Sequence, residues 1–272
     1  MTSGLIVNAD DFGLTQATSR AIEHAHRSGI ATSTSVLAVA PAATASLRAL
    51  DAPDLDVGVH LALVGEDPPL LSAAEVPSLV DRSGRLASSW RVLLGRAPRM
   101  DPAEIEREMR AQVDLVRRAG FRPTHLDPHQ HVHLLPRIAE AVVRVAVAED
   151  IEWVRIPEPR QGGPRSWALD RLARRLRSEV AASGRRAPDR FAGIEDAGHL
   201  DPASLRRRLQ DLAAGSPTVV EVNVHPGPAN DPDRIRYRWG YGWADELAAL
   251  VDPATADACH AAGLRLGRRR DM

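Results

Sequence analysis

Short apolar segments alternate with amphipathic helical patterns along the whole chain of 272 residues, and this alternation restricts the fold more than any other feature. Such segments are typical of strands buried in a parallel sheet, where each strand is followed by a covering helix. We expect strands at residues 5–9, 32–39, 56–63, at the start of 123–136, and at 152–156, 218–224 and 264–267. About seven strands separated by helices predict an α/β fold, a distorted or incomplete TIM-like (β/α) barrel.

Capping residues mark several helix boundaries. Thr15 is a candidate N-cap and Gly29 a candidate stop for the first helix. Asp101 directly before Pro102 predicts the start of a helix over residues 102–119. Further helices are expected after Pro41 and at 137–149, 166–183 and 202–213.

The segment 64–100 lacks clean periodicity and carries several Pro, Ser and Gly residues. We interpret it as an elaborated loop or lid, because the strand–helix alternation resumes after it. A second Pro/Gly-rich loop is expected at 157–165. The sequence therefore predicts a single domain over residues 1–272.

Composition excludes several classes of function. With a formal net charge of −1, the chain has no overall electrostatic field that would attract nucleic acid or a membrane surface. The basic residues are all arginine, which excludes Schiff-base chemistry and the Walker A phosphate loop. The single cysteine, Cys259, excludes an intrachain disulfide, and neither a signal peptide nor a membrane span is recognisable. We expect a cytoplasmic protein; the sequence does not determine its oligomeric state, and a homodimer is compatible with it.

Residues able to bind metal or move protons gather where the predicted strands end. They are Asp10 and Asp11 after the first strand, His60 in the third, His129, His131 and His133 after the fourth, and His225 after a late one. Each alone has a structural explanation, such as a hydrogen-bonded core histidine or a turn-capping aspartate. Together they fall where barrels of this kind carry their active sites, at the C-terminal ends of strands.

Two adjacent carboxylates at the end of a buried strand repel each other and raise each other's pKa. A cation or a shared proton must offset this loss of stability. The HQHVH segment, if extended, directs its three imidazoles to one side. Imidazole and carboxylate ligands without thiolate favour Zn²⁺, with Mg²⁺, Mn²⁺ and Ni²⁺ as alternatives. Two histidines and one aspartate leave coordination positions open, which is typical of a catalytic metal, and the second aspartate stays free to move a proton.

Two further groups have a functional and a structural interpretation. Arg155, at the end of the fifth predicted strand, could orient substrate, pair with a site carboxylate or form a structural salt bridge. Trp239, Tyr241 and Trp243 could stack on a sugar ring, or pack as a loop that closes the barrel.

Five motifs occur in order along most of the chain: NADDFG, TSTSVL, GVHLAL, THLDPHQHVHLLP and EVNVHPG. Together they resemble the YdjC-like carbohydrate deacetylase family, which includes chito-oligosaccharide deacetylases and deacetylases of hopanoid biosynthesis. The resemblance implies a TIM-like barrel and a hydrolase that uses one divalent metal ion to remove the acetyl group from an N-acetylated sugar.

By position, the resemblance implies that Asp11, His60 and His129 hold the metal. It implies that Asp10 is the general base and His225 a proton donor or transition-state stabiliser. Where family members commonly have Ser, this chain has Pro128, which leaves open which of the three histidines in HQHVH points inward.

Other functions remain as alternatives. A lactam or oxoproline hydrolase of the LamB/YcsF type would also begin with an aspartate-bearing strand. A haloacid-dehalogenase-like phosphatase needs aspartates two positions apart at its site and normally a lysine; the aspartates of NADDFG are adjacent, and the chain has no lysine. A non-catalytic carbohydrate-binding or metal-storage module would bind sugar or metal without releasing acetate. The sequence does not distinguish a chito-oligosaccharide from an aminosugar on a lipid or an antibiotic precursor as the substrate.

Overall fold

A parallel sheet forms the centre of the computed structural model, which describes residues 2–158 and 163–272. Its strands are β1 (Ser3–Phe12), β2 (Ser33–Val36), β3 (Asp56–Leu61), β4 (His125–Pro128), β5 (Trp153–Val154), β6 (Arg190–Ala192), β7 (Val219–Val224) and β8 (Leu264–Leu266). They follow the order β5-β4-β3-β2-β1-β7-β6, and β8 pairs with the start of β1. The longest strand, β1, therefore lies in the middle of the sheet.

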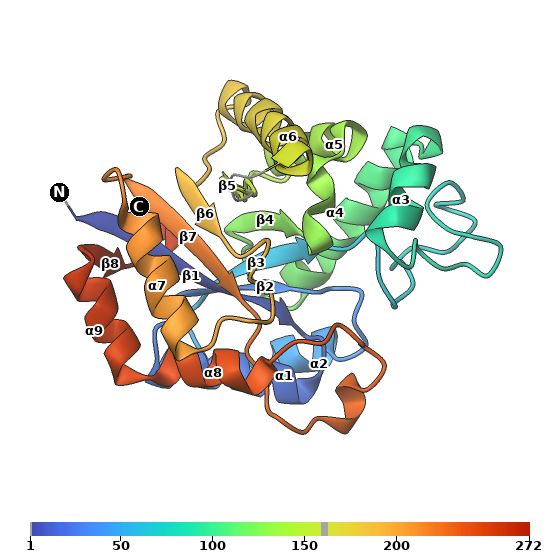
Figure 1. Ribbon diagram of the computed structural model, residues 1–272. Helices are drawn as coiled ribbons and strands as arrows, with labels where there is room; N and C mark the ends of the chain where they lie inside the picture. The colour runs from blue at the N-terminus through green and yellow to red at the C-terminus, as the bar shows by residue number, and fades with distance from the viewer. Residues whose placement is uncertain (1, 159–162) are drawn as a thin grey trace.

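Helices surround this sheet on its outer side (Figure 1). They are α1 (Gln16–Ser28), α2 (Ala43–Ala49), α3 (Trp90–Arg96), α4 (Pro102–Arg118), α5 (Pro136–Ala148), α6 (Gly163–Ala182), α7 (Pro202–Ala213), α8 (Trp243–Val251) and α9 (Pro253–Ala261). Short 3₁₀ turns are η1 (Ala97–Arg99), η2 (His129–Leu134), η3 (Pro232–Arg234) and η4 (Arg269–Asp271). Within this outer layer α1 and α8 lie together on one flank of the curled sheet, and α4, α5 and α6 lie together on the opposite flank.

The sheet does not close into a full barrel in the part of the chain that is described. The strands β5 and β6 stand at the two ends of the strand order and are not paired with each other. This confirms the predicted α/β fold, a distorted or incomplete TIM-like (β/α) barrel. The single-domain organisation stays a prediction.

Local capping explains where two of the predicted helices begin. The Thr15 side chain accepts a hydrogen bond from the backbone N–H of Thr18, and α1 starts at the next residue after this cap. The Asp101 carboxylate accepts from the N–H of Ala103, and α4 starts at Pro102, whose missing N–H costs nothing there. Both predicted starts are confirmed.

The inner side of the curled sheet carries many polar side chains, in contrast to an ordinary protein core, which is apolar. Most strand residues are buried on both faces, as in other parallel sheets. Among them are Asn8, Ser33, Asp56, Glu221 and Asn223, all nearly inaccessible. These polar side chains need partners inside the protein, because burial without hydrogen bonds is costly.

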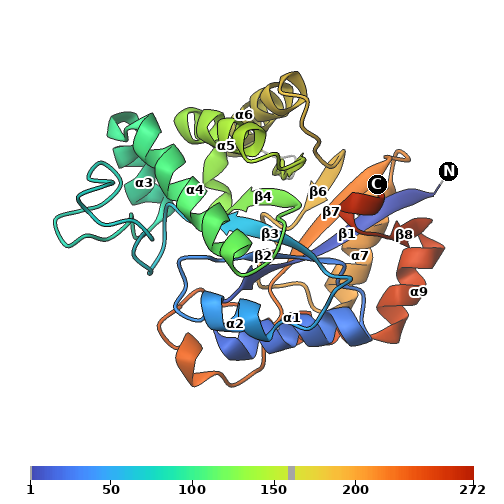
Figure 2. The ribbon, with the colours of Figure 1, turned by 180° about the vertical axis from the view of Figure 1, so that it is seen from behind.

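Several segments differ from the expectation. The strand β6 was not expected from the sequence, and its three residues are too few to show a strand pattern. The segment after β3 is irregular until α3 and η1, and its loop projects from the molecule beside α3 (Figure 2). Within the predicted loop 157–165, residues 159–162 lie outside the described residues, and α6 already begins at residue 163. Among the described helices, none combines the length and apolarity that a membrane span requires.

Candidate active site

A distortion of β1 brings Asp10 and Asp11 to the same cavity. Consecutive side chains of a regular strand point to opposite faces. The pairing of β1 with β2 shifts between Ala9 and Phe12, and Asp11 has a left-handed backbone with φ of 67°. Such a bulge redirects one side chain, and both carboxylates line the cavity at the C-terminal end of the sheet.

Asp11, His60 and His129 form a compact triangle of ligand atoms. His60 Nε2 lies 3.1 Å from His129 Nδ1 and 3.5 Å from Asp11 Oδ1, and His129 Nδ1 lies 3.6 Å from the same oxygen. Asp11 Oδ1 is buried without a hydrogen-bond partner in the described residues. An unpartnered buried carboxylate oxygen facing two imidazoles indicates a place for a cation.

The residues present fit a divalent metal ion. Bonds of about 2.0–2.2 Å in a tetrahedral arrangement separate neighbouring ligand atoms by roughly 3.4 Å, close to the three separations in the triangle. A second cluster, Asp10, His60 and Asp127, also brings ligand atoms together. Its two carboxylates already bind the guanidinium of Arg155, which would repel a cation. The triangle is therefore the better candidate.

His60 is oriented by Asp127 on the neighbouring strand. The two residues are register partners of β3 and β4, so their side chains lie next to each other. His60 Nδ1 lies 3.1 Å from Asp127 Oδ1, which leaves Nε2 for a metal. Burial disfavours the charged ring, but Asp127, followed by Asp10 and Asp11, outweighs burial and raises the pKa of His60 to about 9. The surroundings of this ring thus favour positive charge, from a proton or from a metal.

The surroundings of His129 have the opposite effect on its pKa from those of His60. Burial, followed by the nearby His60, holds the pKa of His129 well below its usual value. The ring is therefore neutral, and neutral imidazole is the form that binds metals.

Asp10 is paired with Arg155, the residue that directly follows β5. Arg155 Nη1 and Nη2 donate to the two Asp10 oxygens at 2.7 and 2.8 Å. Asn8 and Asn223 donate to the same carboxylate at 2.7 and 3.0 Å. Burial opposes ionisation of Asp10, but Arg155 outweighs it and holds the pKa of Asp10 well below its usual value. Asp10 is consequently a carboxylate with fixed orientation.

Arg155 is one member of a buried ionic network inside the barrel. Its Nη2 lies 2.6 Å from Asp127, and its Nε donates to Glu221 at 2.7 Å. Glu221 in turn pairs with Arg269 at 2.9 Å. Arg269 comes from the last turn of the chain and is 1% exposed. The C-terminal segment therefore supplies a counter-charge to the group that holds Asp10.

His225 lines the same cavity and lies close to Asp10. Its Nε2 is 4.0 Å from Asp10 Oδ2, and its Nδ1 is 3.5 Å from Glu246 Oε2 on α8. Burial lowers the pKa of His225, but the Glu246 carboxylate outweighs burial and raises it above its usual value. The ring is thus suited to carry a proton near neutral pH.

The HQHVH segment is not extended, so the expectation that its three imidazoles share one side was wrong. It forms η2, in which Gln130 and His131 have left-handed backbones. Only His129 faces Asp11 and His60. His131 lines the cavity with a neutral ring, and His133 is buried, with Nε2 2.8 Å from the Arg155 carbonyl oxygen.

The aromatic residues of the RWGYGW segment have different positions. Tyr241 lines the cavity and contacts the His225 ring, with centroids 4.8 Å apart. Trp239 lies against His129 and donates its indole N–H to Glu66. Trp243 is buried at the start of α8, beneath the Arg234 guanidinium.

Sequence reasoning missed the partners that orient the central residues. They are Asn8, Asp127, Glu221, Asn223, Glu246 and Arg269. The available signal was a polar residue inside an apolar strand run, as Asn8 in LIVNA and Asn223 in VEVNV. Such a residue must be hydrogen-bonded inside the barrel.

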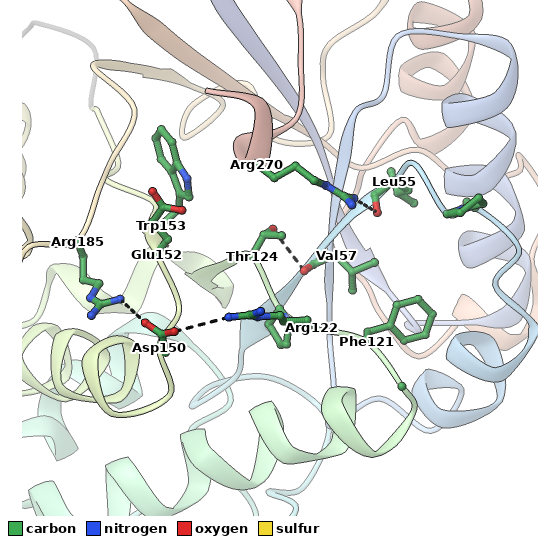
Figure 3. Close-up of a pocket in the computed structure, with 14 residues that line it drawn as sticks. Leu55, Val57, Phe121, Arg122, Thr124, Asp150, Glu152, Trp153, Arg185 and Arg270 are labelled. Carbon is green, nitrogen blue, oxygen red and sulfur yellow. Dashed lines mark hydrogen bonds and ion pairs between the residues drawn. The ribbon is translucent and has the colours of Figure 1, made fainter.

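Another hollow, of about 550 Å³, lies at the opposite edge of the sheet, before the strands β3, β4 and β5 (Figure 3). Its charged side chains are engaged in ion pairs and hydrogen bonds with one another or with neighbouring residues. Asp150 lies between Arg122 and Arg185, at 3.6 and 3.2 Å, and Arg270 donates to Asp56 and to the Leu55 carbonyl oxygen. Neither ligand cluster of the described residues is located there.

Comparison with known proteins gives three findings. The profile of the YdjC-like protein family matches residues 4–261. A carbohydrate deacetylase from Brevibacillus brevis is 38% identical over 82% of this chain and 80% of its own length. A solved structure from Enterococcus faecalis V583, described provisionally as a cellobiose-phosphate cleavage protein, is 25% identical with a TM-score of 0.83 and covers 100% of this chain and 99% of its own.

A more distant solved structure, the lactam utilization protein from Thermus thermophilus, has a TM-score of 0.50 and 14% identity. The similarity covers 98% of this chain and 99% of that one. At this identity the likeness concerns the fold alone.

Proposed function

The chain belongs to the YdjC-like family, and from this premise we propose that it is a metal-dependent carbohydrate N-deacetylase, a hydrolase that releases acetate from an N-acetylated amino sugar. The name of the Brevibacillus brevis relative supports the reaction. The donor set of Asp11, His60 and His129 supports the metal.

One observation carries this proposal: the unpartnered oxygen of Asp11 faces His60 and His129, while the neighbouring Asp10 is kept out of that triangle by Arg155. A divalent ion held by the triangle would supply Lewis acidity, which polarises a carbonyl oxygen and makes water more acidic. The two adjacent aspartates thereby receive separate roles. Asp11 binds the ion and Asp10 remains available to move a proton.

Asp10 acts as the general base. Its carboxylate is ionised and held in one plane by Arg155, so it can accept the proton of the water that attacks the acetyl carbonyl. Asn223 donates to the same carboxylate and limits its rotation further. The orientation of the base is consequently set before substrate binds.

His225 acts as the general acid. An amide nitrogen leaves poorly until it is protonated, and the raised pKa of His225 keeps a proton available on the ring. Its Nε2 lies 4.0 Å from Asp10, so donor and acceptor border the same reaction space. Tyr241 packs against this ring and restricts its orientation.

The experiment is acetate release by chelator-treated protein from N-acetylglucosamine, N,N′-diacetylchitobiose and an N-acetylglucosamine glycolipid, with and without Zn²⁺, Mg²⁺, Mn²⁺ or Ni²⁺. Metal-dependent acetate release is expected from at least one of them, and the response to each ion identifies the metal. Asp11→Asn should abolish metal-dependent acetate release. Asp114→Asn, a substitution at an exposed position of α4, should leave it unchanged.

Hydrolysis of 5-oxoproline without acetate release from any sugar would instead support the lactam-hydrolase alternative. That alternative has only the likeness of fold in its favour. Sugar binding without any hydrolysis would support a carbohydrate-binding module.

A further inference from the structure

We infer that Trp239 is a positioning residue: its indole holds the ring of the proposed metal ligand His129, and Glu66 holds the indole. This inference rests on the metal site of the proposed function and gives a role to two loops outside the triangle. One loop follows β3 and contains Glu66 and Asp67. The other precedes α8 and contains Tyr237 and Trp239.

The two imidazoles of the triangle are supported differently. His60 has Asp127 at 3.1 Å from Nδ1, the nitrogen that faces away from the triangle. Metal-binding histidines usually have such a hydrogen-bond acceptor on the second nitrogen, and it fixes the direction of the ring. Among the described residues His129 has no such acceptor, since its polar contacts with His60 and Asp11 both use Nδ1, which faces the triangle. Packing must therefore orient this ring.

Trp239 supplies that packing. The ring centroids of His129 and Trp239 lie 5.2 Å apart, and the ring planes are inclined by 42°. A Cβ at Gly65 would lie 3.8 Å from Cδ2 and 3.9 Å from Nε2 of His129, so the loop after β3 runs along this edge of the imidazole. Among the described residues, Tyr241 lines the active-site cavity of about 500 Å³ and Trp239 does not. The indole is thus placed to support the imidazole rather than to stack on a sugar in the cavity.

Glu66 fixes the indole in turn. Trp239 Nε1 donates a hydrogen bond to Glu66 Oε1 at 2.9 Å, although 173 positions separate the two residues. Beside this bond the Tyr237 hydroxyl donates to Asp67 Oδ2 at 2.8 Å, and the Arg236 guanidinium pairs with the same carboxylate. Asp67 is only 4% exposed, and a buried carboxylate needs such partners. The two loops are therefore attached to each other at two neighbouring positions.

A ring that is held in advance favours metal binding. An imidazole that rotates freely loses this freedom when it binds a metal, and the loss opposes binding. With Trp239 against the ring and the Gly65 loop at its edge, His129 keeps Nδ1 directed at the other two ligands. The affinity for a divalent ion consequently reports on the contact between Trp239 and His129, and it can be measured without substrate.

The test is a competition titration of chelator-treated protein with Zn²⁺ and a chromogenic chelator. Trp239→Ala should lower the Zn²⁺ affinity by about 10- to 100-fold, the usual cost of losing a group that orients a metal ligand. Trp167→Ala is the matched control. The Trp167 side chain is 63% exposed on α6 and does not line the cavity, so the affinity should stay at the wild-type value.

A double-mutant cycle tests the link through Glu66. Glu66→Ala and Trp239→Phe each remove the hydrogen bond between indole and carboxylate, and each should lower the Zn²⁺ affinity by about two- to tenfold. Because both remove the same bond, the double variant should lose no more than the larger of the two single losses. Glu66→Gln keeps an acceptor for the indole N–H and should retain the wild-type affinity. Glu66 is a partly exposed loop residue, so its variants keep the test open if Trp239→Ala does not fold.

Wild-type Zn²⁺ affinity in Trp239→Ala would overturn the inference, and a raised KM for acetate release in the same variant would assign Trp239 to sugar stacking instead. Wild-type affinity in both Glu66→Ala and Trp239→Phe, or additive losses in the double variant, would overturn the link through Glu66. Absence of Zn²⁺ binding by the wild-type protein would overturn the metal site and the inference with it. Zn²⁺ binding without acetate release from any sugar would overturn the deacetylase function and leave the role of Trp239 standing.

Discussion

Arg155 binds Asp10 through two parallel hydrogen bonds, although the two residues are 145 positions apart in the chain. Arg155 is 1% exposed, so the pair is shielded from solvent and from salt. A bidentate arginine fixes the plane of a carboxylate as well as its charge. This pair accounts for one of the two adjacent aspartates in NADDFG, and the metal proposed at Asp11 accounts for the other.

Asp10→Asn should separate proton transfer from metal binding. The change keeps the shape of the side chain but removes its capacity to accept a proton, so turnover should fall by about 10²–10⁴-fold. Metal content, measured by elemental analysis of the purified variant, should match wild type because Asp10 is outside the triangle. Near-wild-type turnover would show that Asp10 is not the base.

Asp127→Asn should weaken metal binding although Asp127 is not in the triangle. Its carboxylate orients His60 and increases the basicity of that ring, and loss of such a partner costs about 10- to 100-fold in affinity. A competition titration with a chromogenic chelator measures the change, with Asp114→Asn as the control. His60→Ala should bind less metal still. Full metal occupancy in His60→Ala would make His60 an ordinary core histidine.

Gly193→Ala should reduce turnover through Asn223. A Cβ at Gly193 would overlap the Asn223 side-chain oxygen and displace the amide that donates to Asp10. A loss of about 10- to 100-fold in kcat is expected from misplacement of a catalytic group. Gly184→Ala is the control, because Gly184 also has a positive φ but has open space around it. Gly184→Ala should lose roughly 1–2 kcal/mol of stability because of its left-handed backbone, and Gly193→Ala should lose more because of the overlap. Equal kcat values in the two variants would contradict the role of Asn223.

Glu246→Gln should shift the pH dependence of kcat/KM. The proton of His225 is present below its raised pKa and is lost as pH rises through that value. Without the Glu246 carboxylate the pKa of His225 falls, so the basic limb of the profile should move to lower pH by about one pH unit. Glu152→Gln, on an exposed residue of the opposite sheet edge, should leave the limb in place. An unchanged limb in Glu246→Gln would show that another group donates the proton.

Arg269→Met should destabilise the fold strongly. It leaves Glu221, which is buried, with Arg155 as its remaining guanidinium partner, and loss of one member of a buried ion pair costs about 3–5 kcal/mol. The double variant Glu221→Gln/Arg269→Met should recover part of this loss, because no unpaired carboxylate remains. Urea unfolding of both variants measures the difference. A loss below about 1 kcal/mol in Arg269→Met would indicate that water reaches Glu221.

Local signals were sufficient for much of the fold. The caps at Thr15 and Asp101 act within one turn of helix, so they can be read without tertiary information. The alternation of strands and helices predicted the incomplete barrel. It also predicted that the aspartates of NADDFG, His60, the histidines of HQHVH and His225 gather at one edge, because parallel strands end on the same side. The choice of Asp11, His60 and His129 as metal ligands came from the family resemblance.

The details of that edge depended on backbone geometry that the sequence does not display. A regular strand would separate Asp10 from Asp11, and only the left-handed Asp11 in the bulge of β1 brings both to one cavity. In the same way, η2 turns His131 and His133 away from the triangle that an extended segment would have let them join.

The sequence by itself determined the class of fold, the edge of the sheet where the candidate site lies and the residue types of that site. The tertiary structure decided which partner each of these residues has. Arg155, Glu221 and Arg269 meet because β7 lies next to β1 and the last turn of the chain reaches the barrel interior. Hydrophobic periodicity reports which side of an element is buried, but it carries no information about which distant element lies beside it.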